Sequence, residues 1–267
     1  MSLQLAEQFE ANEQYEDAYR EYKKEFDQNP EDLGLMERLG HLSLILEKPE
    51  EAAWYYHEIL KRDVANPLAY EQLISIYENT DKYKYYIYRG NKNSLEGKLE
   101  FAVNDFKKAL AVASDETQII MTRLTLANLY RQQGKDLKAI DEYNIILEYD
   151  NLHEEIFLQL ADLYMKDEAY PSAIDALQRA KQKGFDTDRI NEGLAAVYLK
   201  SGDAASAIKY TKDELLKIQC MLELGQIDEA YAKLNSLPDE FNINIFKNEF
   251  DNFVKNVKVY EYNLTSK

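Results

Sequence analysis

A small residue, usually alanine, returns along this chain at nearly constant intervals. Three of the six successive intervals are 34 residues long, and the residues are Ala18, Ala52, Ala102, Ala139, Ala173, Ala207 and Ala230. Twelve positions before each stands a second small or apolar residue: Ala6, Gly40, Gly90, Ala127, Ala161, Ala195 and Ile218. Two small residues, one on each helix, let two antiparallel helices approach closely. Because one such pair cannot bury its apolar face alone, the spacing predicts a stack of helix pairs.

Composition supports helices. The 267 residues include only 9 Gly and 5 Pro, and no Asn-Gly or Asp-Gly dipeptide occurs. Hairpin turns depend on these residues, so a turn-rich all-β fold is not expected and long helices are favoured.

The repeated residues resemble those of the tetratricopeptide repeat family. The most complete copy contains Leu126, Ala127, Tyr130, Gly134, Ala139, Tyr143 and Ile146, and the next contains Leu160, Ala161, Tyr164, Ala173, Leu177 and Ala180. The resemblance covers roughly residues 2 to 237. It implies an all-α, right-handed superhelical solenoid of antiparallel helix pairs.

The intervals also predict how the chain is divided. Repeats one and two occupy residues 1–66, and repeats three to seven occupy 83–237. Between them, 67–82 reads as an extra helix with no second helix after it, which predicts a discontinuity. The short interval before Ala230 predicts a second helix in repeat six that is either shortened or merged with the next segment. Residues 238–267 read as a C-terminal capping helix and tail, because Phe246, Phe250 and Phe253 share one helical face.

The net charge of −17 limits the partners. Nucleic acids and anionic membranes attract positive proteins, so general binding to either is not expected. The first 66 residues hold 16 acidic and 7 basic side chains. This acidity either attracts a basic partner to the N-terminal repeats or keeps the array soluble. No run approaches 18 apolar residues, and the lone Cys220 agrees with a reducing compartment, so we expect a cytoplasmic protein.

Catalytic and metal-binding motifs are not found in the sequence. Gly97-Lys98 has Lys92 where a phosphate-binding loop needs glycine, and His57 is followed by Lys61 where a zinc helix needs a second histidine. We therefore predict no catalytic residues, no metal and no cofactor. The predicted function is a non-enzymatic scaffold or adaptor that binds a protein or peptide. The alternatives are an accessory regulatory domain, a secretion-type assembly chaperone, or an enzyme without a recognisable motif.

A basic, tyrosine-rich segment at 82–98 interrupts the acidic chain. In one interpretation its cations and rings bind an acidic or phosphorylated partner. In the other, which we favour, the aromatic rings bury an irregular helix junction and the lysines stay in solvent.

The family resemblance also implies binding residues, because first helices line the concave groove in that family. Transferred by position, the candidates are Arg38, His41, Lys84, Tyr88, Asn91, Leu124, Asn128, Arg131, Asp162 and Met165. The family's clamp for C-terminal carboxylates is not reproduced, since Glu37 and His41 stand where its first pair would be. Asn91 and Asn128 can still hydrogen-bond an extended peptide, because an amide both donates and accepts.

Overall fold

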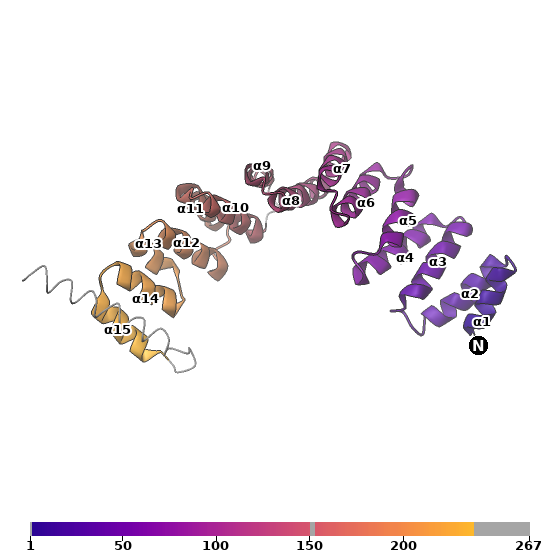
Figure 1. Ribbon diagram of the computed structural model, residues 1–267, viewed down its shortest axis with the longest axis horizontal. Helices are drawn as coiled ribbons and strands as arrows, with labels where there is room; N and C mark the ends of the chain where they lie inside the picture. Colours follow the sequence, from indigo (N-terminus) through magenta and orange to yellow (C-terminus); the bar gives the residue numbers. More distant parts are fainter. Residues whose placement is uncertain (1, 150–152, 238–267) are drawn as a thin grey trace, which may run out of the picture. The chain divides into compact units, whose positions relative to one another are not determined.

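The computed structural model describes residues 2–149 and 153–237. These contain fifteen α-helices and no strand, so the prediction of an all-α chain is confirmed (Figure 1). The helices form two compact units, one ending at Ile146 and one beginning at Leu147. This boundary falls inside the predicted 83–237 block of repeats.

The first unit contains four helix pairs and one single helix. The pairs are α1 (Ser2–Ala11) with α2 (Tyr15–Phe26), α3 (Leu33–Ile45) with α4 (Pro49–Arg62), α6 (Lys82–Leu95) with α7 (Leu99–Val112), and α8 (Glu116–Gln132) with α9 (Asp136–Ile146). The single helix, α5 (Pro67–Tyr77), packs against α4 on one side and α6 on the other.

The second unit contains three pairs. They are α10 (Glu154–Lys166) with α11 (Tyr170–Gln182), α12 (Asp188–Lys200) with α13 (Ala204–Tyr210), and α14 (Glu214–Glu223) with α15 (Ile227–Ser236). Helix α13 is only 7 residues long and ends before α14 begins. The second helix of repeat six is therefore shortened rather than merged. The predicted capping helix falls on 238–267, outside the described residues.

Short polar side chains begin many of the helices. Asp32, Asn66, Asp81 and Asp115 each accept a backbone N–H from the first turn of the helix that follows. Such caps satisfy donors that a helix start leaves unpaired. The sequence thus fixes where α3, α5, α6 and α8 begin.

Each of the seven pairs turns through one residue with left-handed backbone. Glycine takes this position in four pairs, with Gly97, Gly134, Gly202 and Gly225 at φ between 68° and 84°. The other three pairs use Glu13, Glu47 and Glu168 at φ between 55° and 60°. No such residue separates α5 from α6. The α5–α6 connection therefore differs from the turns within the pairs.

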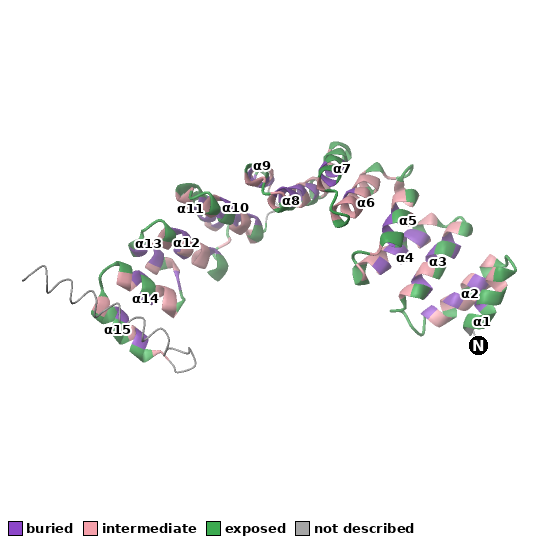
Figure 2. Cartoon of the chain, viewed as in Figure 1, coloured by how far each residue is buried: buried purple, intermediate pink, exposed green. Residues whose placement is uncertain are grey.

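The residues that define the repeat are the contacts between paired helices. All seven alanines of the first set, and all seven small or apolar residues twelve positions before them, are buried. Figure 2 shows buried segments on helices of both units. A Cβ added to Gly40 would lie 3.0 Å from the Tyr56 ring, and one added to Gly90 would lie 2.9 Å from the Phe106 ring. The small side chains therefore permit close approach of the helices.

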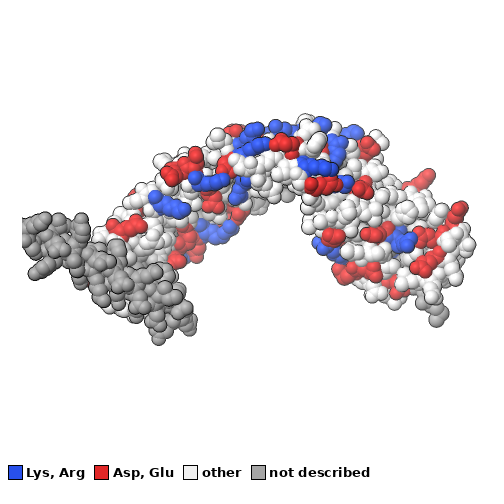
Figure 3. All heavy atoms as spheres, viewed as in Figure 1, with Lys and Arg blue, Asp and Glu red and all other residues white. Residues whose placement is uncertain are grey.

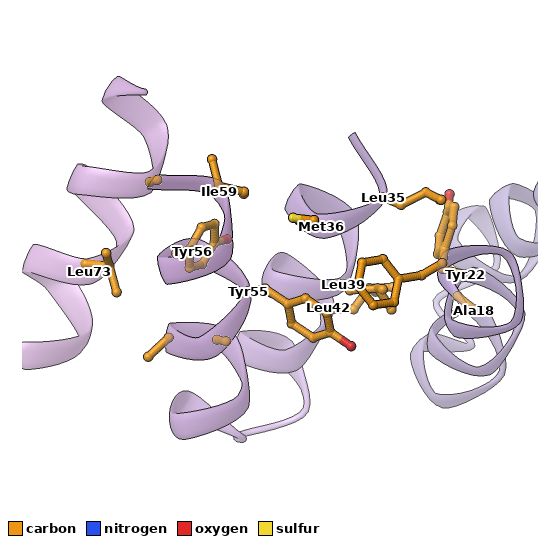
Figure 4. Close-up of a cluster of buried hydrophobic side chains, with 14 of the residues drawn as sticks. Ala18, Tyr22, Leu35, Met36, Leu39, Leu42, Tyr55, Tyr56, Ile59 and Leu73 are labelled. Carbon is orange, nitrogen blue, oxygen red and sulfur yellow. The ribbon is translucent and has the colours of Figure 1, made fainter. Parts of the chain in front are cut away.

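Large side chains fill the space beside these contacts. In the N-terminal cluster Tyr22, Tyr55 and Tyr56 lie among leucines and Met36 of α3, and Ile59 and Leu73 extend the cluster to α5 (Figure 4). Burial raises the pKa of Tyr56 to about 12. In the second unit the corresponding Tyr164 and Tyr198 are only half-buried. Tyrosines at the repeat positions thus contribute more to the core of the first unit than to that of the second.

Candidate functional site

The first helices α6 and α8 are linked directly in the first unit. The Tyr83 hydroxyl lies 3.2 Å from the Gln118 carbonyl oxygen and 3.0 Å from Thr122 Oγ1. Helix α7 packs against both helices. This arrangement fixes α6 and α8 as neighbours at their N-terminal ends.

Helical spacing gathers the candidate residues of each helix on one side. On α8, Met121, Leu124, Asn128 and Arg131 recur at three or four positions, and Met121 is 58% exposed. On α6, Lys84, Asn91 and Leu95 recur at similar spacing, and Leu95 is 50% exposed. We call these seven residues the α6–α8 face. Sequence reasoning omitted Leu95 and Met121, although both occupy groove positions of the repeat.

Asn128 has one intrachain partner. The buried Tyr143 on α9 donates its hydroxyl hydrogen to the Asn128 side-chain oxygen over 3.2 Å. Asn128 is exposed, and its NH2 donates no hydrogen bond to any of the described residues. The contact with Tyr143 therefore orients the amide while leaving its donor for a ligand.

Tyr88, by contrast, belongs to an aromatic cluster. Its hydroxyl lies 3.0 Å from His57 Nδ1, and its ring stacks on Tyr77 with the centroids 5.8 Å apart. The Tyr77 hydroxyl lies 3.1 Å from His57 Nε2. Tyr88 thus ties α6 to α4 and α5, and little of it is left for a ligand.

The surroundings of His57 keep its imidazole neutral. Burial lowers the pKa of His57, and the nearby Lys84 and Lys61 ammonium groups lower it further. A neutral imidazole has one N–H donor and one acceptor. One tyrosine hydroxyl therefore accepts from the ring and the other donates to it.

The candidates on α3 lie elsewhere. Arg38 donates to the Glu10 carboxylate on α1 over 3.2 Å, and the Tyr22 hydroxyl donates to the same carboxylate over 2.9 Å. His41 is exposed and forms no hydrogen bond or ion pair within residues 2–149 and 153–237. Helix α3 packs against α2 and α4. Arg38 and His41 therefore do not form one continuous surface with the α6–α8 face.

The last two candidates belong to the second unit. Asp162 is exposed and Met165 half-buried, both on α10. The structure therefore brings together only the candidates on α6 and α8.

The basic segment at 82–98 has a structural role. Arg89 donates to Asp105 of α7 through Nη2 and also through Nε over 3.0 Å, and Asn93 donates to the same carboxylate over 2.9 Å. Asp105 is buried, and its charge raises the pKa of Arg89. Lys92 pairs with Glu71 of α5 and with Glu96. Several cations of this segment are therefore paired within the chain, while Lys84 and Lys98 keep about half of their side-chain surface in solvent.

A pocket of about 440 Å³ opens between α4 and the α5–α6 turn. Glu50, Trp54 and His57 line it from α4, and Tyr77, Asp81 and Lys84 from the other side. Trp54, the only tryptophan of the chain, is 48% exposed. From its place beside Tyr55 and Tyr56 on a second helix, Trp54 would be expected to serve in packing, but half of it faces solvent.

The described residues hold no cluster of three His, Cys, Asp or Glu side chains that would bind a metal ion. Cys220 is buried on α14, and burial raises the pKa of its thiol. A thiol with a raised pKa is a poor nucleophile. Of the helices described, none has the length and apolar character that crossing a bilayer requires.

Comparison with known proteins gives distant likenesses. No family model matches the sequence. An uncharacterized protein of Plasmodium falciparum is 22% identical over 253 residues, which cover 87% of this chain and 24% of that protein. The chain thus spans about a quarter of the length of this relative.

Several solved structures are similar in arrangement. Naa15/Naa10 bound to HypK-THB matches 90% of this chain and 36% of that chain, at 16% identity and a TM-score of 0.48. The Cut9-Hcn1 hetero-tetramer of the APC/C matches 73% and 42%, at 18% identity and a TM-score of 0.43. A TPR protein of Thermus thermophilus matches 74% and 97%, at 21% identity and a TM-score of 0.35.

The repeat register of the chain itself carries the assignment. Both sets of small residues are buried at helix contacts, and each pair turns through a left-handed residue at the same place. The chain is, in fold, a tetratricopeptide repeat protein.

Proposed function

We propose that the chain is a non-enzymatic, cytoplasmic scaffold that binds a segment of another protein on its first-helix surface. The observation that supports this most is the α6–α8 face, where exposed apolar side chains stand beside amides with free hydrogen-bonding capacity. Met121 and Leu95 are at least half exposed, and Asn91 and Asn128 follow on the same sides of their helices. Exposed apolar residues beside polar ones are typical of protein-binding surfaces.

Each residue type has a physical role in this proposal. The amides of Asn91 and Asn128 hydrogen-bond the backbone of an extended segment, since each can donate and accept. Met121 and Leu124 contact an apolar side chain, and methionine adapts to different shapes. Arg131 contacts an acidic group at the edge of the face. Arg38 and His41 form a second contact region on α3, and Asp162 and Met165 a third on α10.

The acidity of the N-terminal repeats favours partners with basic segments. The excess of carboxylates in residues 1–66 attracts basic segments and speeds their association at low salt. We therefore propose that the protein partner carries basic residues where it meets α1 to α4.

The test compares proteins recovered from a native lysate by the wild-type chain and by an Asn91→Ala, Asn128→Ala variant. We expect specific partner proteins to be recovered with the wild-type chain but not with the variant. Asn128→Asp separates binding from stability, because a carboxylate still accepts from Tyr143 but donates nothing. The matched control is Asn12→Ala with Asn29→Ala, two exposed asparagines in turns of the same unit. Equal recovery by all variants would contradict the proposal.

A further inference from the structure

The pocket between α4 and α5 presents a fixed aromatic ring to solvent. The Trp54 ring makes edge contacts with Tyr55, at a centroid distance of 4.9 Å, and with Phe26 at 6.3 Å. These neighbours hold the indole in place while leaving it 48% exposed. A preorganised ring loses little side-chain entropy when a ligand stacks on it.

The positive charges of the pocket are already committed. The Lys84 ammonium lies 3.4 Å from the Asp81 carboxylate and 4.8 Å from the centroid of the Tyr77 ring. Both nitrogens of His57 face tyrosine hydroxyls, and burial lowers the pKa of His57, which disfavours a charged ring. Neither residue is therefore available to bind an anion.

One negative charge remains available. Glu50 lies in the first turn of α4, is exposed, and makes no hydrogen bond or ion pair with any residue that the structure describes. The surrounding N-terminal helices carry an excess of carboxylates, which is visible on the face drawn in Figure 3. The pocket thus combines an exposed indole, an unpaired carboxylate and the apolar side chains of Ala53 and Ile76.

We propose that this pocket receives an arginine side chain from a bound protein segment. The guanidinium stacks on Trp54 and pairs with Glu50, while its methylene groups contact Ala53 and Ile76. Arginine suits such a site better than lysine because its planar group stacks on aromatic rings and is more weakly hydrated. The inference rests on the proposed function only in that the chain binds protein segments, since the pocket shares Lys84 with the α6–α8 face and the arginine does not contact it.

The chain contains its own reporter for the test, because Trp54 is its only tryptophan. The fluorescence of the full chain is followed while the peptide acetyl-Gly-Ala-Arg-Ala-Gly-amide is added. The same peptide with glutamine in place of arginine is the ligand control. A saturable change is expected with the arginine peptide, and binding at least about five-fold weaker with the glutamine peptide.

Two variants locate the contact. Glu50→Gln should weaken arginine-peptide binding about three- to five-fold. Glu116→Gln, which alters an exposed first-turn glutamate of α8, should leave binding unchanged. Trp54→Ala should abolish binding, which calorimetry measures in the absence of the fluorescent ring. Circular dichroism of this variant should show the helical signal of a folded chain.

Three results would overturn the inference: no saturable change, equal binding of the glutamine peptide, or equal weakening by Glu50→Gln and Glu116→Gln. The Asn91→Ala, Asn128→Ala variant separates this site from the α6–α8 face. It should bind the arginine peptide as the wild type does. If the α6–α8 face binds no protein, only the partner-recovery experiment will show it. If the pocket binds no arginine, only the peptide titration will show it.

Discussion

Arg89 of α6 and Asp105 of α7 form a two-pronged ion pair between the helices of one repeat. Asn93 adds a third hydrogen bond to the same carboxylate. Arg89 and Asn93 occupy positions where the repeat usually has leucine and tyrosine. A polar network therefore replaces part of the apolar contact between α6 and α7.

Removing one member of this network should destabilise the first unit. Asp105→Ala leaves the partly buried guanidinium of Arg89 without its counter-charge, and we expect a loss of about 2 to 4 kcal/mol in the free energy of unfolding. Urea denaturation followed by circular dichroism measures it. The control is Glu100→Ala, which breaks an exposed pair with Lys135 and should hardly change the midpoint. The double variant Arg89→Leu, Asp105→Leu should recover most of the loss, because an apolar contact needs no counter-charge. Equal midpoints for Asp105→Ala and the control would show that the pair contributes nothing.

Enlarging the small residues between paired helices should be unfavourable in both units. Ala139 and Ala173 are fully buried, so replacement of either by leucine overpacks its helix pair and should cost about 1 to 3 kcal/mol. Thermal denaturation provides the measurement. Ala205→Leu on α13 is the control, because Ala205 is exposed. Unchanged melting of the Ala139 and Ala173 variants would contradict the repeat register.

In the turns within the helix pairs, removing a glycine should lower stability and introducing one should raise it. Gly134 has φ +68° and open space where a Cβ would lie, so Gly134→Ala should cost about 1 kcal/mol through backbone strain alone. Glu168 has φ 55° in the equivalent turn, and Glu168→Gly should stabilise the chain by a few tenths of a kcal/mol up to about 1 kcal/mol. Denaturation midpoints that move in the same direction for both variants would refute a shared turn conformation.

The histidine between two tyrosines should make stability depend on pH. The pKa of His57 is lower in the folded chain than its ordinary value of 6.5. Between these two values the unfolded chain binds more protons, so stability is present above 6.5 and falls as the pH decreases toward the folded pKa. Unfolding free energies measured at several pH values should show this slope, and His57→Gln should reduce it. An unaltered slope in that variant would assign the pH dependence to other groups.

The helix pairs could be predicted because spacing encodes them. Ala139 and Ala173 are buried where the 34-residue interval places them, and Gly134 turns the chain where the repeat expects glycine. Such features depend on residues close together in the chain, and a sequence pattern records them directly.

Contacts made possible by α5 could not be predicted in the same way. The groove positions of the repeat family place Tyr88 in the groove. Their transfer assumes that a regular helix pair precedes every first helix. In this chain α5 precedes α6, and Tyr88 meets His57, which is 31 residues away. Arg89 and Asn93 stand out in the sequence as polar residues at packing positions, but the spacing does not indicate that Asp105 is their shared partner.

The most direct test of the binding surface is site-specific photo-crosslinking in a native lysate. A photoreactive amino acid replaces Met121 on the α6–α8 face, or Leu137 on α9, which is even more exposed at 74%. The proposed function predicts discrete adducts from position 121 that disappear when excess wild-type chain is added or when Asn91 and Asn128 are both alanine. Adducts from position 137 of equal yield and identity, or adducts from position 121 that survive both treatments, would contradict it.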